Sequence, residues 1–207
     1  MAKRGLMIVV EGCDRAGKST QCEKLVHNLK TQGLEAEYIK FPDRTTQTGK
    51  MIDDYLQQKN ELDDHAIHLL FSANRWEAMK SIAGKLNKNK TLVVDRYAFS
   101  GVAFSAAKGL DLAWCQHPDV GLISPDLVLF LDLAIDEAER RGGFGEERYE
   151  KRELQIKVRN EFRKLKDDYW KFIDASQTTE KVEQDILKCV KETRQKELGP
   201  VEYNLWK

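Results

Sequence analysis

The sequence predicts an α/β fold in which a parallel sheet of five strands is covered by helices on both faces. Short runs rich in apolar residues alternate along the 207-residue chain with longer segments that have helical spacing. Such alternation is typical of strand–helix–strand units, which build parallel sheets. The strands expected at 6–11 and 126–132 have continuous apolar centres, which indicates burial on both faces. No internal repeat or Gly/Ser-rich linker interrupts the pattern, so we expect a single domain over residues 1–207.

The expected strands and helices follow one another in a regular order. The strands are 6–11, 37–41, 91–95, 126–132 and a weaker one at 170–174. The helices are 18–31, 49–58, 63–86, 135–141, 154–168 and 179–193. Leu25, Val26 and Leu29 give the first helix an apolar face, and Pro42 stops the second strand.

The end of the chain, residues 194–207, is polar and contains Gly199-Pro200. These features predict a surface tail rather than another helix or strand. Trp206 is unusual in such a segment, and we expect it to pack back onto the body of the protein.

Composition excludes several classes of protein. The 34 basic and 34 acidic residues cancel, whereas nucleic-acid binders usually carry a basic excess, so we expect no nucleic-acid partner. No apolar stretch approaches the ~20 residues that span a bilayer, and the apolar run after the N-terminus is too short for a signal peptide. The cysteines have no disulfide-like or metal-like spacing. We therefore expect a cytoplasmic protein with reduced thiols, with the nucleus and the mitochondrion as open alternatives.

The strongest motif is Gly12-Cys-Asp-Arg-Ala-Gly17-Lys18-Ser19, which matches the phosphate-binding loop Gly-x-x-x-x-Gly-Lys-Ser/Thr. A buried strand precedes it and a helix begins at its end, as the mechanism requires. The glycines let backbone N–H groups surround phosphate oxygens, and the helix N-terminus adds positive potential. Lys18 is expected to reach the β- and γ-phosphates, and Ser19 to ligate Mg²⁺. The fold class is therefore that of the P-loop NTPases.

A P-loop alone does not select the reaction, since switch GTPases, ATPases and small-molecule kinases all carry one. A switch GTPase also needs an Asn-Lys-x-Asp motif to recognise its base. The nearest string, Asn87-Lys-Asn-Lys90, ends in lysine where aspartate is required. The sequence therefore disfavours a GTPase.

Two more strand ends carry charged residues. Asp95-Arg96 follows the strand at 91–95, and Arg44 follows the strand that Pro42 ends. Ligands of open α/β sheets bind at the carboxyl ends of the strands. Asp95 is expected to hold Mg²⁺, and the arginines to grip phosphate. A solvent-facing ion pair at Asp95-Arg96 is the alternative without function.

Two further segments suggest a nucleotide site. Phe71 and Arg75 are four residues apart on a helix and share a face, so together they could sandwich and hydrogen-bond a base. Spacing alone favours a core position for Phe71. Residues 140–151 contain Gly142, Gly143 and Gly145 among charges, and suit a short lid that excludes water during phosphoryl transfer. A plain surface loop is the alternative for this segment.

Taken together, these strings closely resemble the eukaryotic thymidylate kinase family. The likeness runs from Gly5 to about Asp185, and the string Val94-Asp-Arg-Tyr-Ala-Phe-Ser-Gly-Val-Ala-Phe104 is nearly diagnostic. Adenylate and UMP/CMP kinases end their P-loops in Gly-Lys-Gly-Thr. This chain has Gly-Lys-Ser-Thr instead and carries Asp14-Arg15 inside the loop.

The resemblance implies transfer of phosphate from Mg-ATP to dTMP by a homodimer. It implies that Arg15 bridges the two phosphate groups, and it makes Arg15, Lys18, Asp95 and Arg96 the catalytic residues. The residues implied to bind ATP and its phosphates are Gly12, Asp14, Arg15, Ala16, Gly17, Lys18, Ser19, Thr20 and Arg141. Those implied to bind dTMP are Asp14, Phe41, Arg44, Phe71, Arg75, Arg96, Ser100, Gly101, Phe104, Tyr149 and Gln155. Ser19 and Asp95 are implied to hold the metal.

Individual roles follow from the same resemblance. Asp14 is implied to bind the sugar 3′-hydroxyl, and Phe104 to crowd its 2′ position. Phe71 would stack on thymine while Arg75 contacts O4, and Tyr149 would close over the deoxyribose. Because arginines occur in both the P-loop and the lid, their shares of catalysis stay open. A kinase for another deoxynucleotide and a catalytically silent nucleotide-binding protein are the alternatives.

Overall fold

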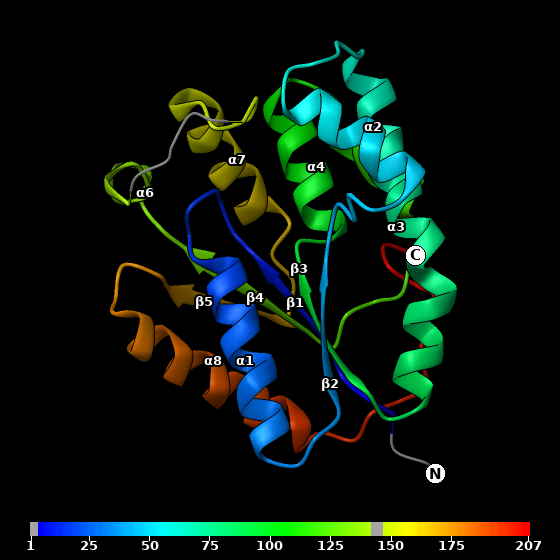
Figure 1. Cartoon of the computed structure of the whole chain (residues 1–207), viewed down its shortest axis with the longest axis vertical. Coiled ribbons are helices and arrows are strands. Elements are labelled where there is room, and N and C mark those ends of the chain that lie inside the picture. The colour runs from blue at the N-terminus through cyan, green and yellow to red at the C-terminus, as the bar shows by residue number, and fades with distance from the viewer. Residues whose placement is uncertain (1–3, 142–146) are drawn as a thin grey trace.

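The computed structural model describes residues 4–141 and 147–207 and confirms the α/β fold. Five parallel strands lie in the order β2-β3-β1-β4-β5 (Figure 1). Their bounds are β1 (Met7–Glu11), β2 (Ala36–Lys40), β3 (Thr91–Asp95), β4 (Leu127–Asp132) and β5 (Trp170–Asp174). All five expected strands are therefore present, each within a residue or so of its expected bounds.

The helices pack on both faces of this sheet. Their bounds are α1 (Lys18–Thr31), α2 (Gln47–Leu56), α3 (Asp64–Asn87), α4 (Ala98–Ala107), α5 (Leu112–Gln116), α6 (Ile135–Arg140), α7 (Arg152–Lys164) and α8 (Thr179–Arg194). Helices α1 and α8 cover one face, and α2, α3, α4 and α7 lie on the other (Figure 1). The strands alternate between the two cores: Met7 and Val9 of β1 join one, while Ile8 and Val10 join the other. This double burial explains the continuous apolar runs.

Helices α4 and α5 were not predicted from the sequence, and the helix predicted at 154–168 runs past the observed end of α7. Helix α4, with the sequence AFSGVAFSAA, is buried around most of its circumference and therefore lacks the polar stripe that marks an amphipathic helix. Helix α5 is only five residues long. Helix α7 ends at Lys164 because a turn follows, in which Trp170 donates its backbone N–H to the carbonyl of Asp167 at 3.0 Å and enters β5.

The C-terminal segment lies on the surface but is tied to the body. Leu205 is buried, and its backbone exchanges hydrogen bonds with Gly121 and Leu122 at 3.0 and 3.1 Å. The Trp206 ring meets Phe99 of α4 edge-on, with centroids 5.6 Å apart, which confirms that Trp206 packs back. The segment thus braces the loop before β4 and the buried side of α4.

Replacing Leu205 with alanine is expected to destabilise the protein by about 2–5 kcal/mol, because it leaves a cavity in a packed site. Urea denaturation would measure the loss. Tyr203→Ala is the matched control, since Tyr203 belongs to the same segment but is 42% exposed. Equal stability of the two variants would show that the C-terminal segment is not anchored through Leu205.

No helix in the described ranges is both long enough and apolar enough to cross a membrane.

Candidate functional site

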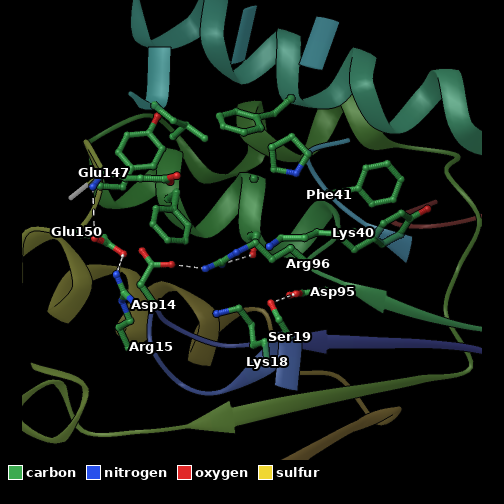
Figure 2. A pocket seen from close by; sticks show the side chains of 18 of the residues that line it. Asp14, Arg15, Lys18, Ser19, Lys40, Phe41, Asp95, Arg96, Glu147 and Glu150 are labelled. Carbon is green, nitrogen blue, oxygen red and sulfur yellow. Dashed lines mark hydrogen bonds and ion pairs between the residues drawn. The ribbon is translucent and has the colours of Figure 1, made fainter. Parts of the chain in front are cut away.

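A cleft of about 490 Å³ opens at the carboxyl ends of β1, β2 and β3. Figure 2 shows its lining side chains converging from the P-loop, the ends of β2 and β3, and the segment after residue 146. The residues expected from the sequence that line it are Asp14, Arg15, Gly17, Lys18, Ser19, Thr20, Phe41, Arg44, Phe71, Arg75, Asp95, Arg96, Ser100, Gly101, Phe104, Arg141 and Tyr149. One edge of the sheet thus gathers residues from across the chain, as parallel topology requires.

The P-loop has the backbone needed to enclose an anion. Gly12 and Gly17 have φ values of 148° and 90°, and Arg15 has 63°. A side chain at Gly12 would also lie 2.7 Å from the carbonyl oxygen of Leu131, so glycine is required there. Lys18 begins α1 and donates from Nζ to the carbonyl of Cys13 at 2.7 Å. Burial and the nearby charge of Arg96 lower the pKa of Lys18, and the charges of Asp14 and Asp95 offset part of that fall.

Ser19 and Asp95 form the candidate metal position. The Ser19 hydroxyl donates to Oδ2 of Asp95 at 2.6 Å, and the Tyr38 hydroxyl donates to the same oxygen at 2.9 Å. The other carboxylate oxygen, Oδ1, is buried and has no hydrogen-bond partner among the described residues. Burial alone would raise the pKa of Asp95, but Lys18, Arg96 and the two hydroxyls bring it below its ordinary value.

These residues fit Mg²⁺. An ionised carboxylate with one oxygen left over, beside a hydroxyl, offers the hard oxygen ligands that the ion prefers. The described residues contain no cluster of three or more His, Cys, Asp or Glu that could hold a metal by themselves. In phosphoryl-transfer enzymes Mg²⁺ is usually held by one or two protein ligands, with water and substrate phosphates as its other ligands.

Arg96 links the P-loop to α4. Its guanidinium pairs with the Asp14 carboxylate and donates to the Gly12 carbonyl at 3.3 Å and to Ser100 Oγ at 3.0 Å. Asp14 is held from its other side by Gln155, whose Nε2 donates to Asp14 Oδ2 at 2.5 Å. Asp14 and Arg96 therefore lie together where the P-loop meets the carboxyl end of β3 and the start of α4.

Gln155 departs from its expected place in the base pocket. It is fully buried, receives the backbone N–H of Asp14 at 3.0 Å and donates to the Tyr149 carbonyl at 3.0 Å. It is not among the described residues that line the cleft. The side-chain amide of Gln155 uses its oxygen and both N–H groups on the P-loop and on the segment before α7, so in this structure Gln155 holds Asp14 rather than facing the cleft.

Two more arginines face carboxylates of the segment that follows residue 146. Arg44 donates to Asp53 at 2.6 Å and to Glu147 at 2.8 Å. The Arg15 guanidinium lies 3.3 Å from Glu150, and both side chains point into the cleft (Figure 2). Each ion pair is partly exposed to solvent, and exposed ion pairs are weak. The carboxylates therefore orient the arginines but can be displaced by a bound anion.

The far wall of the cleft is apolar and carries one buried fork of donors. Arg75 donates hydrogen bonds from Nε and from one terminal nitrogen to the Asp119 carboxylate, at 3.1 and 2.5 Å, and both side chains are buried. Half-buried Phe71 and the ring of Phe104 line the same space, and Phe104 packs 5.4 Å from the ring of Tyr149. This wall suits a flat aromatic base with one hydrogen-bond acceptor directed at Arg75.

The expected lid is described only in part. Gly142, Gly143 and Gly145 lie outside the described residues. Arg141 closes one end of the cleft, where it donates to the carbonyls of Arg15 and Ala175 at 3.1 and 2.5 Å. It therefore joins the P-loop to the loop after β5.

Several important residues were not singled out from the sequence. Asp119 lies in a string, Pro118-Asp-Val-Gly-Leu122, that resembles the family, but it was given no role because its partner Arg75 lies 44 positions away and only the fold brings them together. Glu147 was recognised only as one of the charges in the expected lid, and Glu150 only as the end of the string Arg148-Tyr-Glu150, which resembles the family. The remaining unexpected lining residues are Lys40, Pro42, Leu56, Tyr97 and Ser105.

Comparison with known proteins agrees with this geometry. The family described as thymidylate kinase matches residues 10–186. A thymidylate kinase of Homo sapiens is 50% identical over all of this chain and 99% of its own, and one of Schizosaccharomyces pombe is 54% identical over 90% of this chain and 92% of its own. A solved thymidylate kinase structure from Candida albicans, 36% identical, superposes with a TM-score of 0.91 over 99% of this chain and 100% of that one. The chain belongs to the thymidylate kinase family.

Proposed function

We propose that the protein transfers the γ-phosphoryl group of ATP to dTMP, giving ADP and dTDP. The observation that carries this proposal is the single cleft that joins a P-loop, with Lys18, Ser19 and Asp95, to an apolar pocket with Phe71 and Arg75. A triphosphate donor and a nucleoside monophosphate acceptor can therefore meet in one space. Membership of the thymidylate kinase family selects the base.

On the donor side, the P-loop backbone and Lys18 hold the phosphates, and Ser19 and Asp95 hold Mg²⁺. The bound ion supplies charge neutralisation at the donor phosphates. Arg15 reaches between donor and acceptor, and Arg141 lies on the nucleoside side of ATP. Because the acceptor is already an anion, no general base is needed, and positioning with positive charge carries most of the catalysis.

On the acceptor side, Arg44 and Arg96 hold the phosphate of dTMP, and Asp14 binds the 3′-hydroxyl. Phe71 stacks on thymine, and the terminal nitrogen of Arg75 that Asp119 leaves over faces O4. Phe104 and Tyr149 enclose the sugar. Ser100, Gly101 and Phe41 complete the pocket wall.

A coupled assay of ADP release with Mg-ATP tests the proposed function. The acceptor panel is dTMP, dUMP, AMP, CMP, GMP and thymidine. Turnover with dTMP well above the others is expected. Preference for another monophosphate would overturn the base-pocket assignments, and ATP binding without turnover on any acceptor would favour a silent binding protein.

Gly101→Ala is expected to raise KM for dTMP about tenfold while KM for ATP stays within twofold. A Cβ at Gly101 would lie 2.9 and 3.1 Å from the terminal nitrogens of Arg75, which cannot retreat because Asp119 holds the fork. A misplaced contact far from the reacting atoms can cost up to about 10²-fold. The matched control is Gly84→Ala on α3, where a Cβ meets nothing within 4 Å. An unchanged KM for dTMP would argue against Arg75 as a base contact.

We also propose a homodimer, as the family resemblance implies. The neighbouring helices α2 and α3 expose Met51, Leu69 and Trp76 at 50%, 47% and 40%, which is a high exposure for large apolar side chains. Leu69→Glu is expected to shift sedimentation toward the monomer, whereas Ile156→Glu on α7, 42% exposed, is not. A monomeric wild-type protein at micromolar concentration would contradict the proposal.

Finally, we propose that residues 1–207 act as one domain in the cytoplasm, with residues 140–151 as a short lid. Limited proteolysis with and without a nucleotide pair would test the lid: bound ligand should protect the segment, and equal cleavage would contradict its closure.

A further inference from the structure

Glu11 is a buried ionisable residue that the proposed reaction does not use. It ends β1 immediately before the P-loop and has 0% exposure. It does not line the cleft among the described residues, so it cannot touch a substrate directly. An ionised side chain in such a place is costly unless its hydrogen bonds are complete.

The Glu11 carboxylate holds the first turn of α4. Its Oε1 accepts the backbone N–H groups of Tyr97 and Ser100 at 2.8 and 3.1 Å, and its Oε2 accepts the Ser100 hydroxyl at 2.5 Å. An acidic group at the start of a helix satisfies N–H groups that have no partner within the helix. Burial raises the pKa of Glu11 above its ordinary value, and the Ser100 hydroxyl, Arg96 and the two N–H groups offset part of that rise.

The same hydroxyl continues the chain of hydrogen bonds to the site. Ser100 Oγ donates to Glu11 and accepts from Nη1 of Arg96 at 3.0 Å. Glu11, Ser100 and Arg96 thus form a relay in which each group keeps the next in one orientation. The other end of the Arg96 fork reaches Asp14 in the P-loop.

The backbone at Arg96 shows why such support is needed. Arg96 has a φ of 67°, a left-handed conformation that a non-glycine residue adopts only at a cost. Its N–H donates to the Val10 carbonyl at 3.0 Å, directly before Glu11 in β1. Contacts from the end of β1 therefore hold this turn on both sides, and the turn aims Arg96 into the cleft.

We propose that Glu11 is a positioning residue for phosphate recognition, which orients the Arg96 guanidinium through the Ser100 hydroxyl. The inference rests on the proposed function, in which Arg96 grips the phosphate of the acceptor nucleotide. Both oxygens of Glu11 act as acceptors. Glutamine has only one acceptor oxygen, so an amide that keeps the backbone bonds turns its NH₂ toward Ser100 and takes away the acceptor of the Ser100 hydroxyl proton, which disturbs the relay.

The test compares binding of dTMP with binding of thymidine, which lacks the phosphate, by calorimetry on the full chain. Glu11→Gln is expected to weaken dTMP binding about 10- to 100-fold, because misplacement of a clamp by about 1 Å can cost 10²-fold. Thymidine binding should change less than twofold. Ser100→Ala should reproduce the loss for dTMP, and the double variant should lose no more than the larger single loss.

Controls separate the possible outcomes. Glu183→Gln, which alters a carboxylate bonded to Lys24 and Asn28 between α1 and α8, and Thr193→Val, which removes a buried hydroxyl on α8, should change neither binding constant. Equal weakening of dTMP and thymidine by Glu11→Gln would show a merely structural role and overturn the inference. If Glu11→Gln does not fold, Ser100→Ala decides alone, and its failure to alter the dTMP-to-thymidine ratio overturns the relay.

The Arg96→Lys variant separates a failure of this inference from a failure of the proposed function. An unchanged dTMP-to-thymidine ratio in Arg96→Lys would refute the assigned role of Arg96 itself. A lowered ratio in Arg96→Lys together with an unchanged ratio in both Glu11→Gln and Ser100→Ala would refute only the relay.

Discussion

Replacing Arg15 with alanine is expected to lower kcat by about 10³, with a much smaller change in KM for either substrate. The transferred phosphoryl group spreads negative charge over its oxygens in the transition state, and an arginine placed there is worth 10³–10⁵ in comparable enzymes. Arg15 lines the cleft from inside the P-loop, and Glu150 orients its guanidinium from 3.3 Å away. Single-turnover kinetics with Mg-ATP and dTMP would measure the effect on chemistry alone.

The matched variant Arg141→Ala addresses how the P-loop and the lid divide the work. Arg141 is held on the backbone carbonyls of Arg15 and Ala175, at the edge of the cleft, so we expect its loss to act mainly on ATP binding. A loss in kcat below tenfold for Arg15→Ala, together with a large loss for Arg141→Ala, would move the charge-stabilising role to the lid.

Asp95→Asn is expected to lower turnover by about 10- to 100-fold and to raise the Mg²⁺ concentration needed for half-maximal rate. The change removes the negative charge beside Ser19 and turns one buried acceptor into a donor. Loss of a group that supports a metal typically costs 10- to 100-fold in affinity or activity. Initial rates across a Mg²⁺ titration at fixed ATP would show both changes.

Asp132→Asn is the control for this variant. Asp132 also ends a strand of the same sheet, but it pairs with Arg159 and Arg163 and does not line the cleft among the described residues. Its Mg²⁺ dependence should match that of the wild-type protein. An unchanged Mg²⁺ dependence in Asp95→Asn would remove Asp95 from the metal site.

The contrast between Asp95 and Asp132 illustrates the limit of sequence reasoning about the site. Both are aspartates at the carboxyl ends of apolar strands, so the pattern of apolar residues does not distinguish one from the other. Asp95 was singled out because Arg96 and the family string follow it. Only the strand order, with β3 and β4 on opposite sides of β1, shows which aspartate lies beside Ser19.

Helix α4 shows the same limit for the fold. Buried strands can be predicted from a few neighbouring residues. A short, continuous apolar run such as Met7–Glu11 is typical of a strand in the middle of a sheet. Helix α4 is so thoroughly buried that its sequence has no polar face, and the rule that identifies α1 or α7 fails for it. The missed helix nevertheless carries Ser100, Gly101 and Phe104 into the cleft.

The α/β class, the P-loop and the two other strand ends that carry charge can be recognised in the sequence, because each depends on neighbours within about ten residues. The supporting contacts depend instead on the folded protein. Arg75 with Asp119, Asp14 with Gln155, and Glu11 with Ser100 are pairs separated by 44, 141 and 89 positions. Such partners are fixed by how the chain packs, and a buried polar group is stable only where the packing brings its partner within hydrogen-bond distance. Local pattern cannot specify that distance, so the supporting contacts of the site appear only in the folded protein.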